Sequence, residues 1–587
     1  GGGLPVGACG IIRRAVGEET DDTVAGLEST SGWLDNDPQA LWAVLKHCGA
    51  SRLDYWLGHL APAHTEEFAM QIDDALVRAF ENITYEGALD DNISRRRYHL
   101  PARLRGCGMR SRKDLAPIAH VASFVEAATK MLNITTATGA QLHGFFPTLE
   151  TTFGRGAFDP QGHRFERFIT TPSAQHFRGA WADLQTRVSE SEARGPLGAP
   201  ADLAGKDHKQ HLQRDITRLC EKMERKALHT TNINELAADD ERRCAWMNVD
   251  CLSSQWASAW PTHKHEILDL EMPEIMCSYM GLESPLIRPY EGGTIPIKER
   301  GGETTLAYCD KYGINRGRAT LPGTENTTCH DNCGSELHDH VKEAGFFIQL
   351  GPQKLFENLI PVADIEAQGM EAIVPDAILD MALPAVATGV RQKRGAPRPR
   401  RRLMADFKTI HKGTVSYKQR TSEQSGAVRA REAKVWPAYV AHARKIDSKL
   451  GAPGSKQIEQ RLRSYTETRG VVFGAYGEAS VDVHDIISTA AEAIAKRQWR
   501  QAGACSLTEY RGFAIRNLRR RMGLTIVQEM ARHTISRMPL INVPRQAVED
   551  EMARRRRQRS TNHHAWAPTP EHFDFYAYQQ MPIATMA

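Results

Sequence analysis

The two stretches that decide the fold are IVPDAILD, residues 373–380, and LMADFK, residues 403–408. Each is a short apolar run interrupted by acidic residues, and such runs predict β-strands. Side chains alternate between the two faces of a strand, so Asp406 and Lys408 share one face of the second strand. If the two strands are neighbours, Asp376 and Asp406 come from separate parts of the chain to one place.

Two carboxylates brought together in this way predict a site for a divalent cation. Mg²⁺ and Mn²⁺ prefer oxygen ligands, and Mg²⁺ is usually bound through one or two carboxylates, with water and phosphate completing its shell. Asp376 and Asp406 are the expected ligands, and Asp380, on the same strand face as Asp376, is an additional candidate. Lys408 would orient the attacking water or stabilise charge developing on phosphorus. The expected chemistry is hydrolysis of a phosphodiester bond.

Each motif also has an ordinary structural interpretation. Asp-x-Lys is short enough to recur by chance in a chain of 587 residues. The pair Pro375-Asp376 is a common turn signal, and acidic residues at strand ends are usually solvated. The functional interpretation gains weight because the two motifs occur in order and both lie in strand-like segments.

The insert between the two strands, residues 381–402, is strongly basic. Its Pro and Gly residues predict an exposed loop without regular structure. A basic loop beside a phosphodiester site is expected to contact a nucleic-acid backbone. A nuclear-localisation patch and a merely solvated loop are the alternatives. The arginines expected to bind nucleic acid are Arg394, Arg398, Arg400, Arg401 and Arg402.

The composition bounds the protein class and its environment. A chain of 587 residues is too long for one core and predicts three or four domains. The net charge of +4 is small for this length, and no apolar run approaches the length of a membrane span. Eleven cysteines without regular spacing favour a reducing compartment, nuclear or cytoplasmic, over a secreted protein. The start Gly-Gly-Gly-Leu-Pro suggests part of a longer reading frame.

The expected fold class is a multidomain α+β protein. Its N-terminal two-thirds should be mostly helical, followed by a mixed α/β domain with a small central sheet. In chain order we expect a helical region at 1–150, a loop-rich linker at 151–210, a helical connector at 211–300, a Cys/His segment at 301–340, the mixed domain at 338–500, and a basic helical extension with a disordered tail at 501–587.

Within the mixed domain the expected order of elements is α–β–β–α–β–α. A helix at about 338–344 precedes the two acidic strands. A long helix at about 428–449 follows them and should be kinked or split at Pro437. A strand at 470–477 and an amphipathic helix at about 486–494 complete the domain.

A second metal site is suggested upstream of the acidic strands. Cys329 and Cys333 are separated by three residues and followed by His338, a spacing within the loose range of zinc sites. Cys309 would be the fourth ligand, reached through a long loop. The alternative is that these loop cysteines and histidines bind nothing.

Several of these residues occur in an order that resembles the restriction-like endonuclease domain of non-LTR retrotransposons, which belongs to the PD-(D/E)xK nuclease superfamily. The motifs are His338-Asp339, Pro375-Asp376, Asp406-x-Lys408, Lys434 and Tyr439. The resemblance implies that His338, Asp339, Lys434 and Tyr439 support the catalytic carboxylates. The chain departs from the family at Leu337, where the family has Arg. The gap between Lys434 and Tyr439 is also one residue longer than usual.

The resemblance also implies a function and its partners. Such a domain nicks genomic target DNA, and the freed 3′ end primes reverse transcription of the element RNA, so target DNA and an element RNA or RNA–DNA hybrid are the expected partners. Residues 100–123 look like the stretch downstream of a reverse-transcriptase palm. No Tyr-x-Asp-Asp motif occurs, so this chain is not expected to polymerise DNA by itself. The alternative function is a catalytically inactive nucleic-acid-binding remnant of a retroelement or a domesticated protein.

Overall fold

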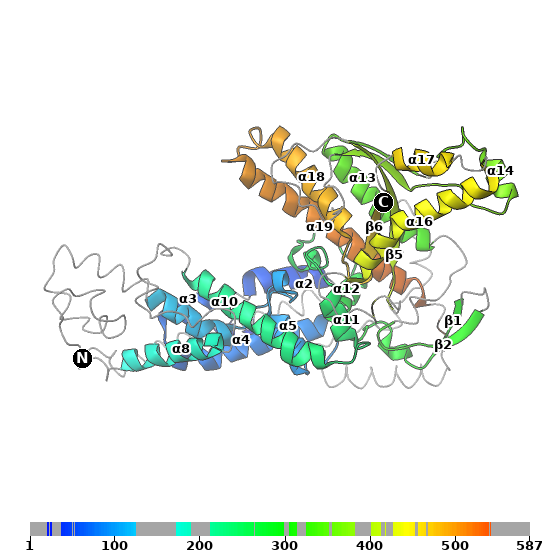
Figure 1. The fold of residues 1–587 in the computed structure, drawn as a ribbon. Coiled ribbons are helices and arrows are strands. Elements are labelled where there is room, and N and C mark those ends of the chain that lie inside the picture. The colour runs from blue at the N-terminus through cyan, green and yellow to red at the C-terminus, as the bar shows by residue number, and fades with distance from the viewer. Residues whose placement is uncertain are drawn as a thin grey trace. The chain divides into compact units, whose positions relative to one another are not determined.

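The computed structural model describes two compact units, one of residues 1–235 with 552–587 and one of residues 236–551 (Figure 1). The described residues are 20–22, 24–25, 37–49, 51, 53–124, 172–189, 212–262, 265–298, 304–313, 325–351, 355–381, 401–412, 417, 426–451, 456–464, 468–538 and 541.

The described part of the first unit is helical. Asp37 accepts a hydrogen bond from the amide of Ala40 at 2.8 Å, and Pro38 occupies the first turn, a favourable start for α2. The helices are α2 Pro38–Val44, α3 Asp54–His59, α4 Pro62–Ile83, α5 Asn92–His99, α8 Pro172–Ser189 and α10 Leu212–Ala227.

The second unit combines helices with two sheets. Its helices are α11 Glu241–Asn248, α12 Glu271–Met280, α13 Glu325–Glu343, α14 Val362–Ala367, α16 Gly426–Leu450, α17 Gln457–Ser464, α18 Val481–Gln498 and α19 Leu507–Ile535. Its strands are β1 Thr294–Lys298, β2 Thr304–Tyr308, β3 Phe347–Leu350, β4 Ala377–Met381, β5 Arg401–Ile410 and β6 Arg469–Gly474.

The larger sheet has the strand order β3-β4-β5-β6 and is mixed. Strands β3, β4 and β5 pair antiparallel, whereas β6 pairs parallel with β5. The register places Ala377 opposite Ala405, and Asp406 opposite Gly470. The two acidic stretches are therefore neighbouring strands, as the sequence predicts.

Two hydrophobic clusters cover the two faces of this sheet, with α18 and α19 on one side and α16 on the other (Figure 1). On the first face Ala405 and Phe407 of β5 pack with residues of α13, α18 and α19. On the opposite face Met404 packs with Val440 and Ile446 of α16. Asp406 and Lys408, which alternate with Ala405 and Phe407, therefore belong to the face that α16 covers.

Glycines allow two helices to approach the sheet closely. A Cβ on Gly334 of α13 would lie 2.4 Å from the Phe407 ring. A Cβ on Gly470 of β6 would lie 3.0 Å from the Cα of Glu432 in α16. Because Gly470 pairs with Asp406, the second approach holds α16 directly over the acidic strand.

The fold class expected from the sequence is confirmed in its coarse form, a mostly helical protein with small sheets. Several details differ. Strand β3, helix α14 and the β1–β2 hairpin were not expected. Helix α16 runs through Pro437 as one helix, so of the expected kink or split the split does not occur. Helix α19, assigned from sequence to a separate extension, packs into the cluster on the sheet through residues such as Leu518 and Met522.

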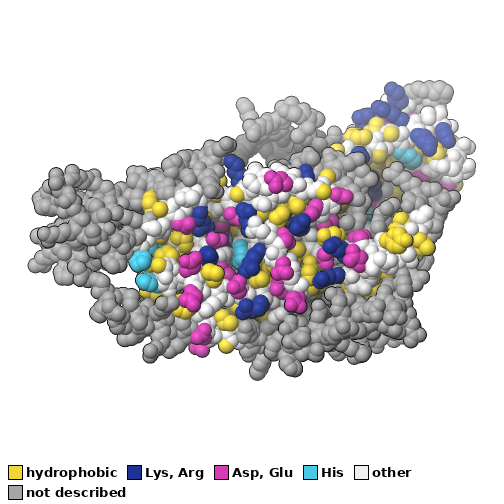
Figure 2. Space-filling model, turned by 90° about the horizontal axis from the view of Figure 1, so that it is seen from below, with side chains coloured by type: hydrophobic (Ala, Val, Ile, Leu, Met, Phe, Trp, Pro, Cys, Tyr) yellow, Lys and Arg dark blue, Asp and Glu magenta, His cyan; other side chains and the backbone are white. Residues whose placement is uncertain are grey.

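On the face drawn in Figure 2, Lys and Arg side chains are interspersed with Asp and Glu, in keeping with the small net charge of +4. Among the described residues, no helix combines the length and the apolar character needed to cross a membrane.

Candidate active site

Asp376 lies immediately before β4 and against β5. Its amide donates to the Ala405 carbonyl at 3.0 Å, which holds its backbone beside Asp406. Its Oδ2 accepts a hydrogen bond from the Phe407 amide at 2.6 Å and lies 3.3 Å from Nε2 of His330. The Asp376 carboxylate is therefore anchored to the neighbouring strand and to α13.

Asp406, in the middle of β5, is only 6% exposed. Its Oδ2 lies 2.8 Å from Nζ of Lys408, two residues along the same strand face. Its Oδ1 accepts a hydrogen bond from the Tyr439 hydroxyl of α16 at 2.9 Å. A buried carboxylate is costly unless it is paired, and here a cation and a hydroxyl satisfy it.

The electrostatics link the two carboxylates through groups that lie near both of them. Burial by itself raises the pKa of Asp376. Hydrogen bonds from His330 and the Phe407 amide, together with the charges of His330 and Lys408, outweigh burial and leave this pKa below its usual value. Burial raises the pKa of Tyr439, and the negative charges of Asp406 and Asp376 raise it further. Lys408 and Tyr439 thus interact with both aspartates.

Of the two histidines of α13 that precede an aspartate, His330 and not His338 contacts Asp376. Its Nε2 faces Asp376 and its Nδ1 lies 2.7 Å from Asp331. Burial lowers the pKa of His330, but hydrogen bonds to Asp376 and Asp331 outweigh burial, and the net shift is upward. A His-Asp pair occurs twice on α13, at 330–331 and again at 338–339.

The choice of His338 and Asp339 from sequence is therefore corrected. These two residues pair with each other at 3.1 Å. They lie eight residues, or about 12 Å of helix, beyond the first His-Asp pair. Because the dipeptide His-Asp occurs twice in this segment, the sequence offered a second candidate pair, His330-Asp331, that could have been considered.

Asp380 cannot serve the same cation as Asp376, because four residues of extended strand separate them by about 13 Å. It lies in β4 opposite Arg402 of β5. Lys434 of α16 is exposed, and no hydrogen bond or ion pair joins it to the two aspartates among the described residues. Of the supporting residues expected on α16, Tyr439 is the one in contact with the carboxylates.

The four residues expected to bind zinc do not converge. Cys329 and Cys333 are buried in the hydrophobic cluster between α13 and the sheet. Cys309 follows β2, where its thiol lies 3.8 Å from the Asp310 carbonyl, and His338 pairs with Asp339. In the described part of the chain, the grouping of three potential metal ligands within 4.8 Å of one another is a different one: Asp250, Cys251 and His484.

Most of the basic insert lies outside the residues that the structure describes. Arg394, Arg398 and Arg400 lie outside the described residues. Arg401 and Arg402 begin strand β5, so the insert is shorter at this end than expected.

Comparison with known proteins identifies no relative of this chain. No model of a known protein family matches the sequence, and no curated protein matches it. A function must therefore be argued from the residues themselves.

Proposed function

We propose that the chain is a metal-dependent DNA endonuclease. Its active site, formed by Asp376, Asp406 and Lys408, would hydrolyse a phosphodiester bond of the DNA. The observation that carries the proposal is the pairing of the two acidic strands, with Lys408 2.8 Å from Asp406 and Asp376 held against the same stretch of β5. Two carboxylates and an ammonium from neighbouring strands are the groups that such hydrolysis requires.

The donor set fits a hard divalent cation. Asp376 and Asp406 are carboxylates, the ligands that Mg²⁺ and Mn²⁺ prefer. Asp376 keeps a depressed pKa and is thus ionised at neutral pH. When bound, the cation would polarise the phosphoryl oxygen and lower the pKa of a coordinated water.

The remaining groups have roles that follow from their contacts. Tyr439 fixes the orientation of the Asp406 carboxylate through its hydroxyl. Lys408, which is one-third exposed, is tethered to Asp406 and can stabilise negative charge that develops on the phosphoryl group. His330 orients Asp376 from the side of α13.

The wider context of the proposal is a retroelement protein. A mixed sheet with an acidic residue beside an Asp-x-Lys strand supports a PD-(D/E)xK-like domain, and the order of motifs resembles that of non-LTR retrotransposons. In that setting the enzyme nicks target DNA in the nucleus to prime reverse transcription of an associated element RNA. The polymerase would be supplied by sequence other than the residues of this chain.

The test is nicking of supercoiled plasmid DNA by the purified chain in the presence of Mg²⁺ or Mn²⁺. Asp376→Asn and Asp406→Asn should each reduce the rate at least about a hundredfold. The matched control is Asp380→Asn, on the same face of β4 but about 13 Å away, which should cleave at a rate close to that of the original chain. Equal cleavage by Asp406→Asn would refute the assignment. Salt-sensitive DNA binding without any metal-dependent cleavage would instead select the inactive nucleic-acid-binding protein.

A further inference from the structure

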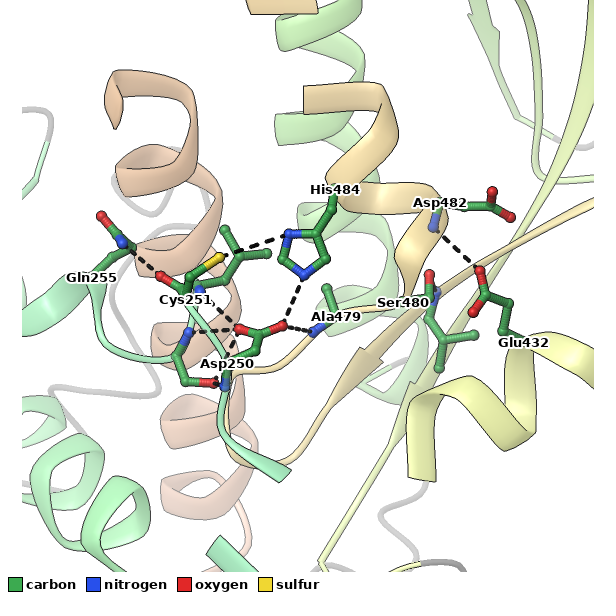
Figure 3. A network of polar contacts seen from close by, with 11 residues as sticks. Asp250, Cys251, Gln255, Glu432, Ala479, Ser480, Asp482 and His484 are labelled. Carbon is green, nitrogen blue, oxygen red and sulfur yellow. Dashed lines mark hydrogen bonds and ion pairs between the residues drawn. The ribbon is translucent and has the colours of Figure 1, made fainter. Parts of the chain in front are cut away.

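Cys251 is an exposed cysteine with a histidine beside its sulfur. It lies between α11 and the short 3₁₀ helix Gln255–Ser258. Its Sγ is 3.9 Å from Nδ1 of His484, near the start of α18 (Figure 3). The two residues are 233 positions apart in the sequence, so the fold creates this contact.

Asp250 holds the other side of the imidazole. Its Oδ2 lies 2.9 Å from Nε2 of His484 and also accepts the amide of Ala479 at 3.1 Å. Its Oδ1 accepts the amide of Leu252 at 2.7 Å. The carboxylate is thus fixed by backbone groups from two segments, and it fixes the ring in turn.

The imidazole is charged at neutral pH. Burial lowers the pKa of His484, but hydrogen bonds to Asp250 and Cys251 outweigh burial and raise this pKa to about 10. Desolvation by itself raises the pKa of the half-buried Asp250, but the hydrogen bond and the charge of His484 help to keep this pKa below its usual value. A cationic imidazole beside a sulfur stabilises the thiolate, which is the nucleophilic form of cysteine.

The grouping suits a reactive thiol better than a metal ion. Asp250 and Cys251 flank different nitrogens of one ring, Nε2 and Nδ1 (Figure 3). The lone pairs of these nitrogens diverge in the ring plane, so one ion cannot bind the imidazole, the thiolate and the carboxylate together. Moreover, both oxygens of Asp250 already accept backbone hydrogen bonds.

We propose that Cys251 is a site of covalent modification, an exposed nucleophilic cysteine beside the imidazole of His484, which Asp250 positions, and that it reacts with low-molecular-weight disulfides. This inference is independent of the proposed endonuclease, because it uses none of the residues of that site.

The reaction is thiol–disulfide exchange. The electron pair of the Cys251 thiolate forms a bond to one sulfur of the disulfide, and the original S–S bond breaks. The departing sulfur leaves as a thiolate and takes up the proton that the Cys251 thiol had given up. The protein thiol is oxidised to a mixed disulfide, and half of the small disulfide is reduced to a thiol.

The surroundings favour exchange at sulfur over acyl transfer. Acyl transfer requires amide donors aimed at a developing oxyanion. The amides of Leu252 and Ser253, which follow the cysteine, both donate to Asp250. Attack on a disulfide produces no oxyanion and needs no such donors.

The test uses competition between cysteines in one folded molecule. The full chain is treated briefly with substoichiometric oxidised glutathione at pH 7, and modified peptides are quantified by mass spectrometry. Cys48 and Cys505 are the matched controls, because both are exposed and, among the described residues, neither thiol is hydrogen-bonded to a histidine. Cys251 should be modified at least about tenfold faster than either. Equal or slower modification of Cys251 would overturn the proposal.

A variant separates the role of the imidazole from simple exposure. His484→Gln should lower the rate at Cys251 to that of Cys505 while leaving Cys48 and Cys505 unchanged. The buried Cys329 and Cys333 report unfolding within the same experiment, since they become reactive only if the core opens. An unchanged Cys251 rate in a variant whose buried cysteines stay protected would contradict the role of His484. If the variant unfolds, the proposal is tested by the relative modification rates of Cys251, Cys48 and Cys505 in the original chain.

Discussion

At the residue scale, Asp406 shows how the site is held together. An aspartate that is 6% exposed is unfavourable inside a sheet unless its charge is compensated. Lys408 supplies the opposite charge from the same strand, and Tyr439 supplies a hydrogen bond from the helix above. The carboxylate therefore links β5 to α16, in addition to its proposed role in metal binding.

The Tyr439 hydroxyl should contribute measurably to stability. Tyr439→Phe removes a hydrogen bond to a carboxylate and should lower the free energy of unfolding by about 1.5–3 kcal/mol. The control is Tyr510→Phe, which removes a hydrogen bond to the amide oxygen of Gln498 and should cost about 0.5–1.5 kcal/mol. Urea denaturation of the metal-free protein measures both. Equal losses for the two variants would show that the Tyr439–Asp406 hydrogen bond is no stronger than a hydrogen bond to a neutral amide.

The contact between His330 and Asp376 should depend on pH. The pKa of His330 is raised in the folded state, so its contribution is complete below the unfolded value of about 6.5 and is lost as pH rises through the folded value. The pKa of Asp376 is lowered, so its contribution is lost only in strong acid. His330→Asn should therefore destabilise the metal-free protein more at pH 6 than at pH 9, as measured by urea midpoints. If the loss of stability caused by His330→Asn instead became larger as pH rises, this assignment would be wrong.

Sequence reasoning identified part of this site and missed part of it. Asp376, Asp406 and Lys408 could be singled out because the strands beside them show in the local sequence pattern, and strands that follow one another in the chain often pair. His330 could not be chosen over His338, since both precede an aspartate on the same helix. Only the packing of α13 against Phe407 decides which of the two faces Asp376.

At the element scale, the position of α13 on the sheet is determined by how closely it packs against β5. Gly334 meets the Phe407 ring so closely that no side chain fits between them. His330 lies one turn earlier on the same helix, and its ring also packs on Phe407, with centroids 5.6 Å apart. The depth of α13 on the sheet therefore fixes the position of His330 relative to Asp376.

Substitution of Gly334 tests this packing. Gly334→Ala places a methyl group into the Phe407 ring, and the overpacking should cost about 1–3 kcal/mol, partly offset by about 1 kcal/mol of helix propensity. Gly512→Ala in α19 is the control, since among the described residues no atom outside its own helix backbone and chain neighbours lies within 4 Å of the added Cβ, and it should stabilise by about 0.5–1 kcal/mol. Thermal unfolding distinguishes the two. A stabilising Gly334→Ala would show that α13 is not confined at this depth.

The elements that the sequence did not reveal share a physical cause. Strand β3 is four residues long, and β1 and β2 are five each, too short for alternation to stand out from chance. Helix α19 looked like a basic extension because arginines dominate its first half. Its buried residues, such as Leu518 and Ile526, are placed only by contact with the sheet domain.

At the scale of the whole molecule, the sheet domain is larger than the expected 338–500. The cluster on its first face begins with Leu252 and ends with Met530. Residues 236–551 form one compact unit by their contacts. The polar grouping of Asp250 and His484 also joins the start of this unit to α18.

A fragment of residues 236–551 should therefore fold alone, whereas a fragment of residues 338–500 should not. The shorter piece lacks α19 and Leu252 and would expose the apolar face that they cover. Circular dichroism with urea titration should give one cooperative transition for the longer fragment and none for the shorter. Cooperative unfolding of 338–500 would show that α19 is dispensable for the fold.

The most direct test of the proposed site is a count of bound Mn²⁺ by electron paramagnetic resonance, which detects the free ion. The chain should bind one Mn²⁺ that Asp376→Asn and Asp406→Asn each abolish and that Asp380→Asn retains. Undiminished binding in Asp406→Asn, with the protein folded, would show that the two carboxylates do not share a cation.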